Sequence, residues 1–412
     1  MVAPPISPDD PDNPLSQRAL TAYRGPLAIT FATSVAVSTG SSLLYPVLPV
    51  LAADLQAGAS EVGLVMAAFT APAVVLAPIF GVIGDRRSRK WMLILGLALF
   101  GLAGSAAAFA PTFSWLLFLR VLQGVGMSAL TPLTIILISD LMPEEREIHG
   151  QGLKVVIDRI AMMLFPVMGG FLAAISWRLA FAPFVLSLPL ALMAYFWMPE
   201  TSRPGTETLR QYFRQTLRGL REPRLTSAFA TGFIRFFLDY GLFTYLSLFL
   251  ALRYGATPAT AGWLIAVSSA GSIVTAMSIG HIHTRMAAER FLALAFCGCS
   301  LSLAAVALQP PIWVIGVAVF VFGLGNGLLS PLQKSLLTRN TQPALRGGVI
   351  SVDRVIQQIA NSLAPTLMGL LLLVADLETV FWSLCAVGVA GTLLLLLADV
   401  KHRGRSGPSD VQ

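Results

Sequence analysis

Charged residues are scarce in this chain of 412 residues, where Asp, Glu, Lys and Arg together make up 12%. A soluble domain carries about a quarter charged residues, so this composition predicts a protein whose solvent is lipid. Its three cysteines lie in apolar runs and are expected to pack there rather than form disulfides. The sequence also lacks a nucleotide-binding loop, a zinc set and a nucleophile elbow. An ATP-driven pump or a membrane hydrolase therefore has no support, and neither an enzyme activity nor a cofactor or metal is expected.

What the chain does have is long apolar runs. A helix that crosses a bilayer needs about 20 mostly apolar residues, and a backbone in lipid must satisfy its own hydrogen bonds, which requires helices. The sequence therefore predicts an all-α membrane protein with twelve transmembrane helices. The predicted spans are 26–51, 60–84, 91–109, 113–138, 151–174, 180–198, 227–252, 258–280, 290–308, 312–334, 349–374 and 378–399.

The polar stretches between these runs predict the domain organisation. Residues 199–226 form the longest polar stretch and separate six spans from six, so we expect a cytoplasmic linker there. It joins an N-terminal six-helix bundle at 26–198 to a C-terminal six-helix bundle at 227–399. The Pro- and Asp-rich residues 1–25 are expected to be a disordered cytoplasmic tail. Residues 400–412 are expected to form a second cytoplasmic tail.

The distribution of Lys and Arg predicts the orientation. With the N-terminus inside, 22 of the 28 cations fall in cytoplasmic segments, and the outer loops hold Arg178 and Arg253. Cytoplasmic loops are rich in Lys and Arg, so both termini are predicted to be cytoplasmic, in a bacterial-type inner membrane. Topology thus accounts for the net charge of +7, and no nucleic-acid partner is expected.

One short loop between spans two and three carries four cations in the five positions 86–90. Such a loop cannot lie in hydrocarbon, so it is a turn at the membrane surface. It resembles the signature G-x-L-a-D-r-x-G-r-k of the major facilitator superfamily. Ser88 stands where that family usually has glycine, which predicts a less tightly bent turn. The matching residues are Gly81, Asp85, Arg86, Arg89 and Lys90.

Further segments extend the resemblance over nearly the whole chain. Arg120, Gln123 and Gly124 match the family's span-four motif R-x-x-Q-G. Span five matches part of the antiporter motif, which implies a bend that seals the outer side against span eight. The matching residues there are Gly152, Pro166, Gly169 and Gly170. The chain most resembles the twelve-span drug:proton antiporters, which implies a midplane substrate site between two parallel halves and a monomer.

Charges inside a membrane are costly and usually face a cavity or a partner. Asp239 is the deepest acid, near the midplane, and Arg235 lies one turn earlier on the same helix face. A close arginine lowers the pKa of a carboxylate and burial raises it. Two interpretations of Asp239 are therefore open: a carboxylate that takes up and releases a proton, or a permanent ion pair with Arg235.

These deep charges give the predicted site. Proton coupling is assigned to Asp239, Arg120, Asp158 and Arg235. The alternatives are structural pairing for Arg120 and an inner ion-pair gate for Asp158. The resemblance implies that the signature loop, with Asp353 and Arg354, forms an inner gate that stabilises the outward-facing state. The substrate cavity is expected to contain Tyr45, Gln123, Phe236, Tyr240, Gln357 and Asn361.

These features predict a secondary active transporter that exports small amphipathic or drug-like compounds in exchange for protons by alternating access. Span one carries several hydroxyl side chains and no acid, which weakens a preference for cations. One alternative is a proton-coupled uptake symporter for a sugar, an organic acid or a siderophore, against which the span-five motif argues. The other is a membrane receptor or scaffold that transports nothing.

Overall fold

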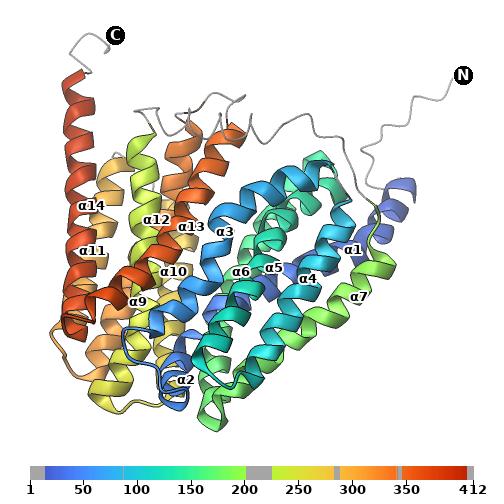
Figure 1. Cartoon of the computed structure of the whole chain (residues 1–412). Helices are drawn as coiled ribbons and strands as arrows, with labels where there is room; N and C mark the ends of the chain where they lie inside the picture. Colours follow the sequence, from blue (N-terminus) through green and yellow to red (C-terminus); the bar gives the residue numbers. More distant parts are fainter. Residues whose placement is uncertain are drawn as a thin grey trace, which may run out of the picture.

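The computed structural model describes residues 14–86, 88–200, 225–282, 288–339, 341 and 346–405, and in this part of the chain short turns connect helices (Figure 1). Most of the predicted linker and the far ends of both predicted tails lie outside these residues. The helices are α1 (Pro14–Ser42), η1 (Tyr45–Val47), α2 (Leu48–Asp54), α3 (Val62–Arg86), α4 (Arg89–Ala106), η2 (Ala107–Phe109), α5 (Phe113–Leu141), α6 (Glu144–Ile175), η3 (Trp177–Leu186), α7 (Ser187–Trp197), α9 (Thr226–Tyr254), α10 (Pro258–Ile282), α11 (Ala288–Ala307), α12 (Ile312–Arg339), α13 (Arg346–Leu371) and α14 (Leu377–Arg405).

Eleven segments of the described chain are long and apolar enough to cross a membrane. The remaining span is α13, which has 26 residues but carries Asp353, Gln357 and Asn361 along its length, and these lower its hydropathy. The predicted all-α fold with twelve transmembrane helices is thus confirmed. Helices α1 and α6 begin at Pro14 and Glu144, before the predicted spans, because a helix continues into the polar residues that flank its apolar run.

Helices α1–α7 form one half of the molecule and α9–α14 form the other (Figure 1). In the described chain, α4, α7, α11 and α14 make their main contacts within their own half. Their outer faces leave large apolar side chains uncovered, such as Leu95, Leu192, Leu301 and Leu397. These helices, which correspond to spans three, six, nine and twelve, therefore have a peripheral, lipid-facing position.

The two halves meet where α3 packs on α13 and α6 packs on α10. Between α3 and α13, the Thr70 and Ser362 hydroxyls are 3.0 Å apart. Between α6 and α10, the Ser269 hydroxyl donates to the Met162 carbonyl at 3.3 Å. Further along, Tyr45 of η1 packs against aromatic side chains of α9. Helix α2, which follows η1, lies at the end of the molecule opposite to the end of α14 (Figure 1).

The outer end of the N-terminal half is fixed by polar contacts around Asp54. Its carboxylate accepts hydrogen bonds from the Trp177 indole at 2.7 Å and from Arg178 at 3.3 Å. The Ser176 hydroxyl caps the first turn of η3 by accepting from the Arg178 amide at 3.3 Å. Because Asp54 and Arg178 are both half exposed, their ion pair contributes little to stability.

Candidate functional site

The predicted coupling acid, Asp239, is buried and belongs to a three-residue relay. The Arg235 Nε donates to the Asn326 side-chain oxygen at 2.7 Å, and the Asn326 amide donates to an Asp239 carboxylate oxygen at 2.5 Å. The Arg235 guanidinium also stacks over the Phe236 ring, 4.4 Å from its centroid. Among the described residues, the connection between Arg235 and Asp239 runs through Asn326. The direct ion pair assumed in one interpretation is therefore replaced by an uncharged bridge.

Asn326 was not among the predicted site residues, although it connects the two that were. It belongs to α12, between glycines that let this helix approach its neighbours closely. A Cβ at Gly323 or Gly327 would collide with a backbone carbonyl of α10, at Ser268 and Ser272 respectively. This close packing fixes the helix and holds Asn326 against α9. A single amide side chain within an apolar, glycine-rich span is the sequence signal that could have identified it.

Asp353 is also buried, and both of its carboxylate oxygens are bound by amides. The Gln333 amide donates to one oxygen at 2.7 Å, and the Gln357 amide donates to the other at 2.5 Å. Gly232 faces this pair, and a Cβ there would crowd the Asp353 oxygen and the Gln333 amide. These contacts bring α9, α12 and α13 together within the C-terminal half. Arg354, the next residue, is exposed on α13.

Arg120 of α5 is fully buried and binds neutral acceptors. Its guanidinium donates to the Gln123 side-chain oxygen at 2.7 Å, to the Gly40 carbonyl at 2.8 Å and to the Val65 carbonyl at 3.3 Å. It also lies 4.3 Å from the centroid of the Phe69 ring. These bonds join α5 to α1 and α3, so the geometry agrees with the structural alternative for Arg120.

Asp158 connects two helices of the N-terminal half. One carboxylate oxygen accepts from the Ser34 hydroxyl of α1 at 2.6 Å, and the other accepts from Lys154 at 2.7 Å. Because Lys154 lies one turn earlier on α6, this ion pair is local to the helix. The neighbouring Arg159 is half-buried and makes no hydrogen bond or ion pair to another described residue.

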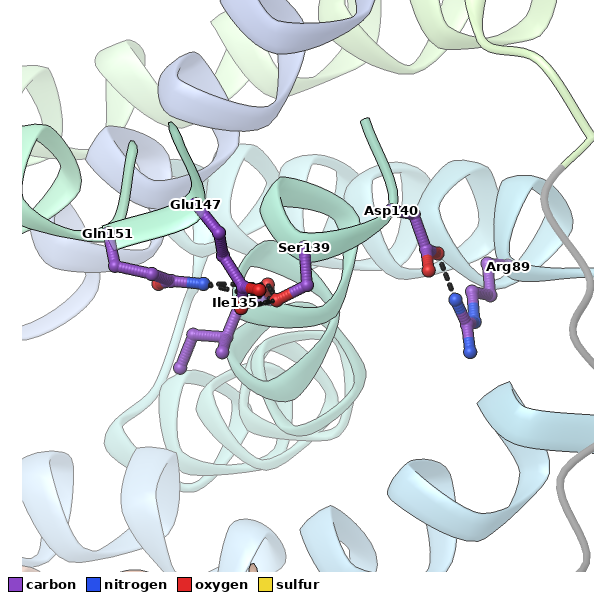
Figure 2. Close-up of polar contacts among 6 residues, drawn as sticks. All are labelled: Arg89, Ile135, Ser139, Asp140, Glu147 and Gln151. Carbon is purple, nitrogen blue, oxygen red and sulfur yellow. Dashed lines mark hydrogen bonds and ion pairs between the residues drawn. The ribbon is translucent and has the colours of Figure 1, made fainter. Parts of the chain in front are cut away.

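The signature loop is tied to its own half by a buried ion pair. Arg89, at the start of α4, pairs with Asp140 near the end of α5 (Figure 2). Ser88 caps α4 by accepting from the Trp91 amide at 3.4 Å, and its φ of −59° needs no glycine. Where the family usually has glycine, this chain therefore has a serine whose hydroxyl caps the helix. Lys90 lies 5.7 Å from the centroid of the Tyr195 ring.

The side chains of Asp85 and Arg86 lie outside the described residues, so the inner gate stays a prediction. Sequence reasoning missed Asp140 because its partner, Arg89, is 51 positions away in the sequence.

Beside the pair of Arg89 and Asp140, a second group of polar contacts joins the end of α5 to the start of α6 (Figure 2). In that group Ser139 donates to Glu147, and the Gln151 amide donates to the Ile135 carbonyl at 3.0 Å. Gly81 has open space where a Cβ would stand.

The glycines of the antiporter-like segment of α6 differ in how closely neighbouring backbone approaches them. A Cβ at Gly169 would collide with the Leu43 carbonyl of the first span, and one at Gly170 would collide with Pro258 at the start of α10. The Pro166 carbonyl in turn lies against Gly262 of α10. Gly152 has nothing within 4 Å of its Cβ position. Close packing therefore requires glycine at the outer positions of this segment.

Replacing Gly169 with alanine should destabilise the protein by about 1–3 kcal/mol, because the added methyl overpacks a contact with backbone. The control is Gly152→Ala in the same helix, which should be neutral or stabilise by about 0.5–1 kcal/mol. Thermal unfolding of the purified variants in detergent measures both. Equal unfolding temperatures for the two variants would contradict this account of the segment.

The six predicted cavity residues fall into separate groups. Tyr45 and Tyr240 meet edge to face across the two halves, with ring centroids 6.1 Å apart, and Phe236 stacks on Arg235. Gln123 is fully buried against Arg120. The two residues on α13 make hydrogen bonds within their own helix, Gln357 to Asp353 and Asn361 to Gln358. The structure thus places Tyr45, Phe236 and Tyr240 nearest to the relay of Asp239.

Twelve spanning helices in two packed halves, with buried charged side chains inside each half, are typical of a membrane transporter. The sequence profile of the Major Facilitator Superfamily matches residues 30–365 and 228–411, and the chain belongs to this family of secondary transporters. The chain is 25% identical over 386 residues to the bacillibactin exporter of Bacillus subtilis, which covers 89% of this chain and 94% of the relative. It is 24% identical over 382 residues to the quinolone resistance protein NorA of Staphylococcus aureus, with 90% and 96% covered.

Solved structures agree with this fold. A bacterial homologue of the human lysosomal transporter Spinster matches with a TM-score of 0.72 at 17% identity, over 94% of this chain and 96% of the other. The nucleoside transporter NupG matches with a TM-score of 0.71 at 12% identity, over 90% and 99%. At these identities the likeness concerns the fold alone.

Proposed function

We propose that this chain exports small amphipathic compounds in exchange for protons, by alternating access between its two halves. The names of two relatives that align with about nine tenths of the chain describe an exporter and a drug-resistance protein. The observation that carries the proposal is the buried Asp239 carboxylate, which an amide separates from the nearby arginine. Such a carboxylate is suited to binding the coupling proton.

The uncharged bridge matters because a carboxylate in direct contact with an arginine is held in its ionised form. In the relay, Arg235 donates to Asn326 whatever the protonation state of Asp239. Protonation of Asp239 therefore leaves the arginine hydrogen-bonded, and a buried unpaired donor is avoided. Asp239 can then alternate between a charged and a neutral form without a rearrangement of its neighbours.

The contacts between the halves support an inward-facing state. Tyr45 lies against Tyr240 and Phe243, in the middle of α9, with ring centroids 6.1 and 5.6 Å away. At the end of the molecule opposite to the start of α1, Gly63 at the start of α3 lies against the Pro365 carbonyl of α13. Gly170 and Pro258 meet near the same end. Joined at this end, the halves would admit substrate from the side of the N-terminus, where an exporter collects it.

We infer from the Lys and Arg count that this side is the cytoplasm of a bacterial-type cell and that both termini lie there. A green fluorescent protein fused after residue 412 should fluoresce, since it folds in the cytoplasm. An alkaline phosphatase fused at the same place should be inactive. Active phosphatase with no fluorescence would reverse the proposed orientation.

The experiment that tests the function uses the purified chain in liposomes with an imposed pH gradient. Norfloxacin and ethidium serve as probes, and a pH-sensitive dye records proton movement. Export by antiport predicts that probe and protons move in opposite directions and that an uncoupler stops both. Movement in the same direction would indicate a symporter, and the absence of any flux would indicate a protein that does not transport these compounds.

A further inference from the structure

Arg159 carries an unassigned charge at the boundary between the halves. One face of α6 contacts α10 through Met162, Pro166 and Gly170, which are spaced four residues apart. Arg159 lies three residues before Met162, so it continues the same face toward the cytoplasmic end. It is half-buried and is not hydrogen-bonded or ion-paired to any other described residue. The described residues therefore leave its guanidinium donors to a further partner.

The groups opposite Arg159 are charged and of both signs. Arg159 interacts electrostatically with Arg235 and Asp239 of α9 and with Lys334 of α12. Arg235 and Lys334 also interact with Asp353 of α13. Across the boundary between the halves, Arg159 thus interacts with one carboxylate, Asp239, and with two cations, Arg235 and Lys334. Within this group, Arg159 is the cation on α6, and an anionic group bound to it would also lie near these charges.

We propose that Arg159 binds a carboxylate of the transported compound, and that the compound is a zwitterion whose basic group lies toward Asp239. This inference rests on the proposed antiport. Antiport also distinguishes a purely anionic substrate from a zwitterionic one, because the two respond differently to protonation of Asp239. A pure anion would bind more tightly when Asp239 is protonated, so it would travel with the proton. A basic group near Asp239 instead competes with the proton for the same carboxylate. Competition of this kind is what exchange requires.

The geometry of arginine suits this role. Its planar fork of donors matches a carboxylate with two parallel hydrogen bonds, which a lysine ammonium cannot reproduce. In the described structure, Asn326 binds one oxygen of Asp239, and this leaves the other oxygen for a substrate ammonium or a proton. The site is therefore bipolar, with a cationic pole on α6 and an anionic pole on α9.

The test uses the purified full chain in detergent and three compounds with one apolar body. 2-Naphthylalanine is a zwitterion, its methyl ester is a cation, and its N-acetyl derivative is an anion. Calorimetry should show the zwitterion binding most tightly. Arg159→Gln should weaken binding of the zwitterion and the anion about tenfold or more, because a charge-assisted hydrogen bond is lost, and leave the ester unchanged. Arg159→Lys should restore part of the loss.

The matched control is Arg146→Gln, an exposed arginine of the same helix, which should change none of the three affinities. The proposal is overturned if the ester binds as well as the zwitterion, if Arg159→Gln weakens all three compounds equally, or if no compound binds. These measurements need no gradient, so they are independent of the liposome assay. If the chain exports substrate with the proton gradient but does not prefer compounds with a carboxylate, this inference alone is wrong. If it prefers compounds with a carboxylate but shows no proton-driven flux, the proposed antiport is wrong.

Discussion

Asp239→Asn is expected to abolish proton-driven export completely while the protein stays folded. Asparagine has nearly the shape of aspartate, and it can still bond to Asn326, so the relay of α9 and α12 is retained. It cannot bind and release a proton, however, so proton movement down the pH gradient can no longer be coupled to transport. Flux of norfloxacin into liposomes under an imposed pH gradient should fall to that of liposomes without protein.

A second assay separates coupling from movement. Exchange of labelled for unlabelled substrate at equal pH needs alternating access and no net proton transfer, so Asp239→Asn should retain it at saturating substrate. The control is Asp54→Asn, which alters an outer carboxylate bonded to Trp177 and Arg178 and should leave driven flux intact. If Asp239→Asn still concentrates substrate and this depends on the pH gradient, coupling belongs to Asp158 or Asp353.

Arg120→Lys is expected to destabilise the protein by about 2–4 kcal/mol, because a lysine cannot reach the three acceptors that the guanidinium binds. At least one carbonyl or amide oxygen would be left buried without its donor. The unfolding temperature in detergent should therefore fall by several degrees. Transport should fall with it, since these bonds hold α5 against α1 and α3.

Arg178→Lys provides the comparison. Arg178 also donates to a carbonyl, that of Ala108, and to the Asp54 carboxylate, but it is half exposed. Its replacement should cost less than about 1 kcal/mol. If Arg120→Lys keeps its full stability and loses only proton-driven flux, the coupling role predicted from the family resemblance applies and the structural interpretation is wrong.

The sequence was sufficient for the fold because each span carries its own signal. An apolar run long enough to cross a bilayer is a local property, and twelve such runs can be recognised one by one. Even α13, whose polar residues lower its hydropathy, was recognised from the apolar residues on its other faces. Helix ends were less well predicted, because α1 and α6 extend into polar residues that hydropathy does not register.

The site was only partly predictable, for a physical reason. Charges in spans stand out in any apolar sequence, so Asp239, Arg235 and Arg120 were identified. Their partners are uncharged amides and carbonyls, which do not stand out from the other residues of an apolar sequence. Asn326 lies 87 positions from Asp239, and its role follows from the close packing of α12 rather than from a motif. Gln333 remained unnoticed beside Asp353 in the same way.

The pairing of opposite poles at Arg159 and Asp239 has an electrical consequence. A zwitterion carries no net charge, so for one proton exchanged per substrate each cycle would move one positive charge into the cell. The membrane voltage then contributes about 2.3 kcal/mol per 100 mV, which corresponds to roughly a 50-fold concentration ratio. Export would continue at this level where the external medium is no more acidic than the cytoplasm. A transporter with a bipolar site can thus run on voltage alone.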